Sequence, residues 1–236
     1  MKKMPKALLT IIIFLMPFYL FRFAIGPIPS TLLEVGIYLT FLYFLLSGNL
    51  NLGKKSKIIW PAVIFLIFGL VGALLDPELS RGLGLWKGYF FDGFLVYLMI
   101  ISQDDTYDYL LPAIFYSGAL VAVLTLIAYF SGVKSLDGRL LDLERLSPNY
   151  LAMFLTPILI IGLFVCAKTR LLVNYLALAV IFASLALTGS RGTLVALSGS
   201  VIILIYQLLR KMIKKVSVVA LIVMLLLFFI GGYLVF

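Results

Sequence analysis

Long apolar runs separated by short polar segments fill almost the whole chain. A helix that crosses the hydrocarbon core of a bilayer needs about 20 mainly apolar residues. Runs of this kind predict spanning helices at residues 7–24, 31–47, 58–75, 86–102, 109–131, 149–167, 171–188, 192–209 and 216–236. The pattern therefore predicts an all-α fold, a polytopic membrane helix bundle of about nine transmembrane helices.

The composition indicates that lipid is the solvent of this bundle. Hydrophobic residues make up 64% of the 236 residues, charged residues make up 12%, and the mean hydropathy is +1.18. A typical soluble domain has about 25% charged residues, so a water-soluble chain of this composition could not cover its own surface. The sequence contains no repeat or compositional boundary, and we expect a single transmembrane domain over residues 1–236.

The basic residues predict the orientation of the chain. Lysine and arginine are enriched in the cytoplasmic loops of membrane proteins. With a cytoplasmic N-terminus, 12 of the 19 Lys and Arg residues fall on inner segments and 7 on outer segments. We therefore expect a multi-pass protein of the cytoplasmic (inner) membrane. The net charge of +9 is not a nucleic-acid signal, because the basic residues form no basic face with interleaved aromatic residues.

The use of cysteine and histidine excludes several kinds of site. Cys166 is the single cysteine, so no disulfide can form within the chain. The chain has no histidine, which excludes histidine-metal sites and histidine-dependent catalytic triads. We predict neither a metal nor another cofactor.

Two polar stretches predict a place for chemistry. In the first, Ser147 is a favourable N-cap for the helix at 149–167, and Arg139 and Arg145 precede it. In the second, residues 188–193, Ser190 can cap the next helix and Arg191 follows it. Both helix starts face the outer side in the predicted topology, where their free N–H groups favour anions. Because guanidinium groups pair well with phosphate oxygens, we predict an outer anion site for a phosphate or diphosphate.

Structural roles are the alternative for each of these charges. Basic residues near span ends commonly extend to the lipid headgroups, and this applies to Arg81, Lys87, Arg139 and Arg145. Three further ionisable groups are expected to pair within the bundle. Arg22 and Glu34 flank the first outer turn and can pair with each other, and Asp92 can pair with Lys87 or Arg81.

The two polar stretches resemble motifs of the O-antigen ligase family, which includes lipopolysaccharide O-antigen ligases, polysaccharide polymerases and some protein oligosaccharyltransferases. The first hairpin is similar as well, with Pro17-Phe18, Gly26-Pro27-Ile28-Pro29 and Leu32-Leu33-Glu34. The motifs that carry the resemblance are Arg139, Ser147-Pro148-Asn149-Tyr150-Leu151-Ala152 and Leu187-Thr188-Gly189-Ser190-Arg191-Gly192.

The resemblance implies a membrane glycosyltransferase with a GT-C-like fold. The donor would be a glycan on an undecaprenyl-diphosphate-type lipid, and the acceptor a hydroxyl of a glycan, lipid or protein. Arg139 and Arg191 would hold the diphosphate without a metal. The other residues that we assign to this site are Asn149, Ser190, Lys87 and Arg81.

The chain also departs from the family pattern. Family members continue into a large extracytoplasmic loop with a histidine that is thought to activate the acceptor, whereas this chain has no histidine and ends in an apolar run at 231–236. We therefore expect this chain to be the N-terminal portion of a longer architecture. Asp137, Asp142 and Glu144 are candidate bases, with solvated loop carboxylates as the alternative.

Two other functions fit the same pattern. A carrier or flippase for a polysaccharide or anionic lipid precursor would place charged residues at the bilayer midplane. A non-catalytic membrane scaffold would have no cluster of cationic groups at its outer face.

Overall fold

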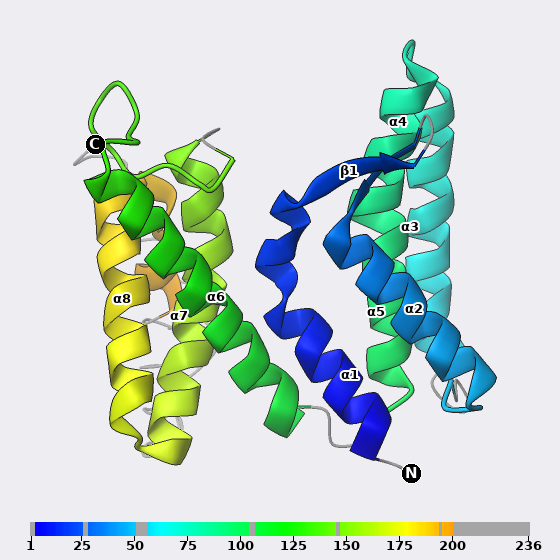
Figure 1. Ribbon diagram of the computed structural model, residues 1–236, viewed down its shortest axis with the longest axis horizontal. Coiled ribbons are helices and arrows are strands. Elements are labelled where there is room, and N and C mark those ends of the chain that lie inside the picture. The colour runs from blue at the N-terminus through cyan, green and yellow to red at the C-terminus, as the bar shows by residue number, and fades with distance from the viewer. Residues whose placement is uncertain are drawn as a thin grey trace, which may run out of the picture. The chain divides into compact units, whose positions relative to one another are not determined.

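A computed structural model describes residues 3–25, 28–50, 56–103, 107–144, 147–193 and 195–200. The described chain is mostly helical and divides into two compact units, Met1–Leu120 and Val121–Phe236. The boundary between the units falls inside the long helix α6 (Tyr107–Phe130) (Figure 1). Each unit is described by itself below. The predicted span 216–236 and most of the span 192–209 lie outside the described residues.

Apolar helices account for most of the predicted spans. By length and composition, three helical stretches of the described chain can cross a membrane: Leu79–Ile101, Tyr107–Phe130 and Pro148–Thr169. Shorter apolar helices lie at Met4–Phe14, Leu32–Leu46, Ile59–Leu74 and Leu172–Thr188. These helices make the protein a plausible membrane protein. The number of nine spans, the GT-C-like architecture and the cytoplasmic N-terminus stay predictions.

The first predicted span, 7–24, is wrong as a continuous helix. Helix α1 (Lys3–Phe14) ends before Pro17, and a 3-10 helix, η1 (Met16–Leu20), follows it. Proline has no N–H group to donate, and its ring clashes with the carbonyl of the preceding helical turn. A proline therefore disfavours continuation of the α-helix at this position, although α6 continues through Pro112.

A β-hairpin follows η1, so the described chain is not entirely α-helical. Strand β1 (Arg22–Ile25) pairs antiparallel with β2 (Ile28–Thr31), in a register that joins Arg22 to Thr31. The backbone groups on the facing edges of the two strands pair with each other. Helix α2 (Leu32–Leu46) starts directly after β2. Thr31 and Glu34 form its capping box, each side chain accepting a backbone N–H of the other residue.

Lys87 connects this hairpin to the helices that follow α2. These are α3 (Ser56–Leu74), α4 (Leu79–Trp86), the π-helix η3 (Lys87–Phe91) and α5 (Asp92–Ile101). The Lys87 ammonium donates to Glu34 Oε2 at 2.8 Å, to Ser30 Oγ at 3.3 Å and to the carbonyl oxygen of Pro29. An ammonium has three N–H donors, so these partners can use all of them.

The pairing of the ionisable groups therefore differs from the sequence expectation. Glu34 forms its ion pair with Lys87 rather than with Arg22, and the two side chains are 11% and 17% exposed. Asp92 is buried, and its Oδ1 has no hydrogen-bond partner among the described residues. The sequence could not show this arrangement, because residues 29–34 and Lys87 are more than fifty positions apart in the chain.

The core of the N-terminal unit lies between α1, α2, α5 and the first half of α6. Its fully buried members include Leu9, Phe44 and Met99. Helix α4 packs closely on the end of α3, where a side chain on Gly82 would meet the carbonyl oxygen of Ala73 and lie 2.8 Å from Cβ of Asp76. Position 82 in α4 therefore requires glycine.

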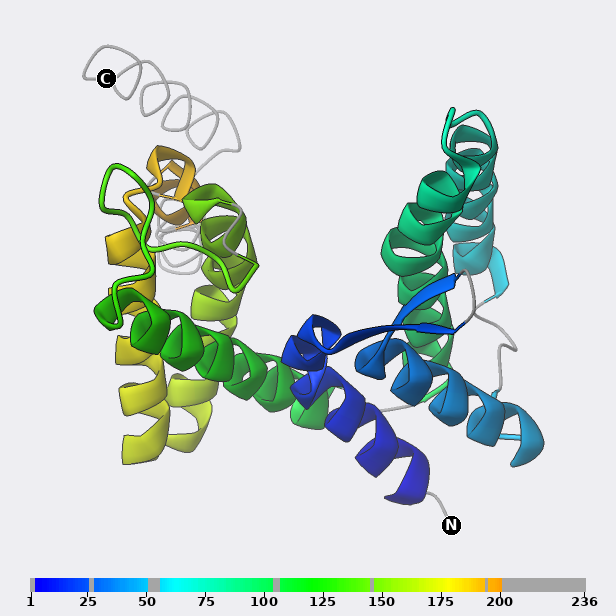
Figure 2. The ribbon, with the colours of Figure 1, turned by 45° about the horizontal axis from the view of Figure 1, so that its top comes forward.

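The C-terminal unit is built on a helical hairpin. Helix α7 (Pro148–Thr169) and helix α8 (Leu172–Thr188) run antiparallel beside each other (Figures 1 and 2). Arg170, with a φ of 54°, makes the left-handed turn between them. The second half of α6 joins this hairpin through Ser184, whose hydroxyl donates to the carbonyl oxygen of Ala122 at 3.3 Å.

Substitution of Gly82 by alanine tests the α3–α4 packing. We expect Gly82→Ala to destabilise the protein by about 1–3 kcal/mol, because the added methyl group clashes with backbone atoms. Gly72→Ala on α3 is the matched control, since nothing lies within 4 Å of the added atom. Thermal unfolding in detergent checks this, and equal melting temperatures of the two variants would contradict the packing.

Candidate functional site

The C-terminal unit contains an open cavity of about 1000 Å³. It lies where α7 begins and α8 ends, beside the loop residues 131–144. Its lining residues are Asp137, Arg139, Asn149, Met153, Thr156, Pro157, Ile160, Gly189, Ser190, Arg191, Gly192, Thr193, Ala196 and Ser200.

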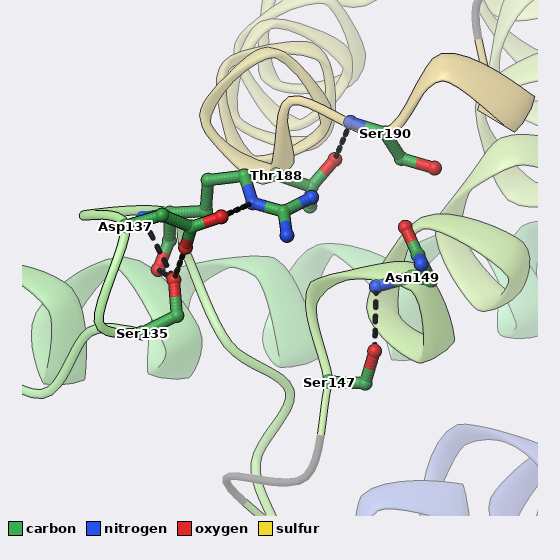
Figure 3. Close-up of polar contacts among 7 residues, drawn as sticks. Ser135, Asp137, Ser147, Asn149, Thr188 and Ser190 are labelled. Carbon is green, nitrogen blue, oxygen red and sulfur yellow. Dashed lines mark hydrogen bonds and ion pairs between the residues drawn. The ribbon is translucent and has the colours of Figure 1, made fainter.

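The start of α7 forms one side of the cavity. Ser147 has extended backbone angles, and its Oγ accepts the N–H of Asn149 at 3.1 Å (Figure 3). Pro148 occupies the first helical position, and Asp142 accepts the N–H of Ser147 at 3.3 Å. The predicted N-cap is confirmed. It places Asn149 in the first turn of α7, with an exposed side chain at the cavity.

The end of α8 forms the opposite side. Gly189 adopts a φ of +57° and closes the helix, with its N–H donating to the carbonyl oxygen of Ala186 at 3.2 Å. The Thr188 hydroxyl accepts the N–H of Ser190 at 3.3 Å (Figure 3). A new helix starts at residue 191, and the carbonyl oxygen of Ser190 accepts the N–H of Thr193 at 3.1 Å. Arg191 is therefore the first residue of this helix.

The loop residues 131–144 bring the two polar stretches together. The N–H of Leu140 donates to the carbonyl oxygen of Leu187 at 2.9 Å, and the Leu140 side chain is fully buried. The preceding residue, Arg139, lays its aliphatic stem against Gly189. A β-carbon on Gly189 would lie 3.1 Å from Cδ of Arg139 and 3.6 Å from Cγ. Glycine at this position therefore permits both the left-handed helix end and the approach of the arginine.

Asp137 is the ionic partner of Arg139. Arg139 Nε lies 2.5 Å from Asp137 Oδ2, and the two side chains are 38% and 54% exposed. The Ser135 hydroxyl donates to the other carboxylate oxygen of Asp137, and its Oγ accepts the N–H of Arg139 at 2.9 Å (Figure 3). The Ser135 hydroxyl and the Arg139 guanidinium hold the pKa of Asp137 below its ordinary value. Asp137 is therefore ionised at neutral pH.

Four of the six residues assigned from the sequence line this one cavity: Arg139, Asn149, Ser190 and Arg191. The two helix starts that carry Asn149 and Arg191 both border it. Arg81 and Lys87 belong to the N-terminal unit, where Arg81 is exposed on α4 and Lys87 is bound to Glu34. The role of all six residues as ligands of a lipid diphosphate stays a prediction.

The sequence analysis treated Asp137 as a candidate base and did not assign it a role beside Arg139. Its lowered pKa makes it a poor base. The signal that could have identified the pair is the spacing of Ser135, Asp137 and Arg139 around Gly138, whose φ of +79° indicates a tight turn.

The cavity combines a cationic rim with an apolar wall. Arg139 and Arg191 supply guanidinium groups, and two helix N-termini add partial positive charge. Met153, Pro157 and Ile160 on α7 supply apolar surface below them. This arrangement suits an anionic group that is attached to an apolar chain.

Comparisons of the chain with protein-family models, with curated proteins and with solved structures give no match. The resemblance to the O-antigen ligase family therefore stays a prediction based on the two short motifs.

Substitution of Gly189 tests the contact that joins the two polar stretches. We expect Gly189→Ala to cost about 1 kcal/mol for the left-handed backbone and more for displacing Arg139. Gly132→Ala is the matched control, because Gly132 has a φ of +93° and nothing within 4 Å of an added β-carbon. In thermal unfolding, the excess loss in Gly189→Ala should disappear when Arg139 is also alanine. An excess that persists there would show that the contact is unimportant.

Proposed function

We propose that this cavity binds the diphosphate of a lipid-linked glycan, and that the protein transfers the glycan to an acceptor hydroxyl at the outer face of the cytoplasmic membrane. The observation that supports this most is that Arg139 and Arg191, fifty-two positions apart in the sequence, line one cavity with an apolar wall.

Charge gives the first argument for a diphosphate. Each guanidinium presents a planar set of donors that matches two phosphate oxygens. Arg191 opens a helix and Asn149 lies in the first turn of another, so backbone N–H groups at both starts add to the positive potential. Asp137 offsets part of the charge of Arg139, and the rim stays cationic through Arg191 and the helix ends.

The apolar wall gives the second argument. A free phosphate would need only the rim, whereas a lipid-linked diphosphate also places hydrocarbon against the protein. Met153, Pro157 and Ile160 follow one another along α7 from the rim. Ala196, on the helix that starts at residue 191, also lines the cavity. Burial of hydrocarbon on such a surface contributes about 25 cal/mol per Å².

In the proposed reaction, an oxygen of the acceptor hydroxyl attacks the anomeric carbon of the donor sugar. The bond from that carbon to the diphosphate oxygen breaks, and the lipid diphosphate leaves with the electron pair. The acceptor proton passes to a base. The two arginines stabilise the transition state, because they stand where the leaving diphosphate gains negative charge.

Removal of either arginine tests the proposal. We expect Arg139→Ala and Arg191→Ala each to weaken the binding of farnesyl diphosphate about tenfold or more, the loss of one charge-assisted pair. Binding is measured by calorimetry with the full chain in phosphatidylcholine nanodiscs. Lys168→Ala removes an exposed charge from the opposite end of α7 and should leave the affinity unchanged.

The alternatives give different results in the same assay. If the arginines only contact lipid headgroups, their removal leaves the affinity for farnesyl diphosphate unchanged, and the proposal fails. A carrier would bind the probe through these arginines but would move a lipid-linked glycan across vesicle membranes without transferring its sugar. A scaffold would not bind the probe.

A further inference from the structure

We propose that Asp137 is a positioning residue that fixes the guanidinium of Arg139 with its terminal edge directed to the ligand. This inference rests on the proposed function, because it assigns the way in which the diphosphate site is oriented. It concerns a carboxylate at the rim of an anion site, where charge alone would make a negative group unfavourable.

The geometry of the ion pair carries the inference. Asp137 engages Arg139 through Nε, at 2.5 Å from Oδ2. Among the three guanidinium nitrogens of Arg139, Nε is the one that has a hydrogen bond to another described residue. The two Nη groups form the edge that pairs with two phosphate oxygens in a fork-to-fork contact. A bond at Nε restricts rotation of the guanidinium and leaves this edge for a ligand.

Ser135 determines how Asp137 makes this contact. Its hydroxyl donates to Oδ1 of Asp137, while Oδ2 receives Arg139 Nε. A carboxylate with both oxygens free could instead pair with Nε and one Nη together and so occupy part of the ligand edge. The Ser135 contact favours the single bond. The same Oγ accepts the backbone N–H of Arg139 at 2.9 Å, which fixes the start of the side chain.

Two further contacts restrict the stem of Arg139. Its Cγ and Cδ pass over Gly189, and the next residue, Leu140, is held by its hydrogen bond to Leu187. A long arginine side chain that rotates freely loses rotamer entropy when a ligand immobilises it. A side chain that is held beforehand at both ends loses less of this freedom on binding.

The sign of the effect separates positioning from charge. Removal of a negative charge near an anion site should by electrostatics alone tighten the binding of an anion. Removal of a positioning group should weaken it. Asp137→Asn therefore gives opposite results under the two explanations. Glu144→Gln removes the same charge from the same loop at a residue that does not line the cavity, and it serves as the matched control.

A double-mutant cycle tests the inference on the full chain in phosphatidylcholine nanodiscs, with farnesyl diphosphate as the probe. We expect Asp137→Asn to weaken binding about tenfold when Arg139 is present and less than about twofold when Arg139 is alanine. Ser135→Ala should show the same dependence on Arg139, with a loss of about threefold. Glu144→Gln should leave the affinity unchanged or raise it slightly.

The outcomes distinguish this inference from the proposed function. If Arg139→Ala and Arg191→Ala leave the affinity unchanged, the proposed function fails and the positioning role fails with it. If both arginines matter but Asp137→Asn binds as tightly as the wild type or more tightly, the positioning role alone is overturned. An equal loss with and without Arg139 would also overturn it, because a general effect on the loop does not act through the arginine.

Discussion

The approach of Arg139 to Gly189 is the contact on which the cavity depends. It joins a loop before α7 to the end of α8 and brings a cationic side chain beside Ser190 and Arg191. A β-carbon at Gly189 would oppose this approach, and the left-handed backbone there also favours glycine. The hydrogen bond from Leu140 to Leu187 fixes the loop beside this contact. Without these contacts, the two polar stretches would be separate surface features.

Hydrogen-bond pairing of polar groups shapes the rest of the structure. A buried backbone N–H or C=O group without a partner is costly, so most of the described chain is helical. Where α1 stops before Pro17, the chain forms a two-stranded hairpin instead of an open loop. The charge of Lys87 is balanced in the same way, since Glu34 and two oxygens of the hairpin surround it. For Lys87 and Glu34, which are largely buried, these contacts supply the partners that burial requires.

The cavity of the C-terminal unit carries a negative group, Asp137, beside two positive groups, Arg139 and Arg191. Asp137 and Arg139 form a partly exposed pair, so the pair contributes little to stability by itself. Its effect is geometric, because a carboxylate bound at Nε leaves the Nη edge of the guanidinium for a phosphate. Arg191 and the two helix starts add positive charge from other elements. An anion with an apolar tail fits this combination of rim and wall.

The apolar helices, the N-cap at Ser147 and the two polar stretches could be predicted from the amino-acid sequence, because they depend on hydrophobic runs and local hydrogen bonds. The break of the first helix into a hairpin was not predicted, although Pro17 was a visible signal. The ion pair of Lys87 with Glu34 and the contact of Arg139 with Gly189 depend on how the helices pack in three dimensions. Each joins residues about fifty positions apart, and no local pattern in an amino-acid sequence records which distant segments will pack together.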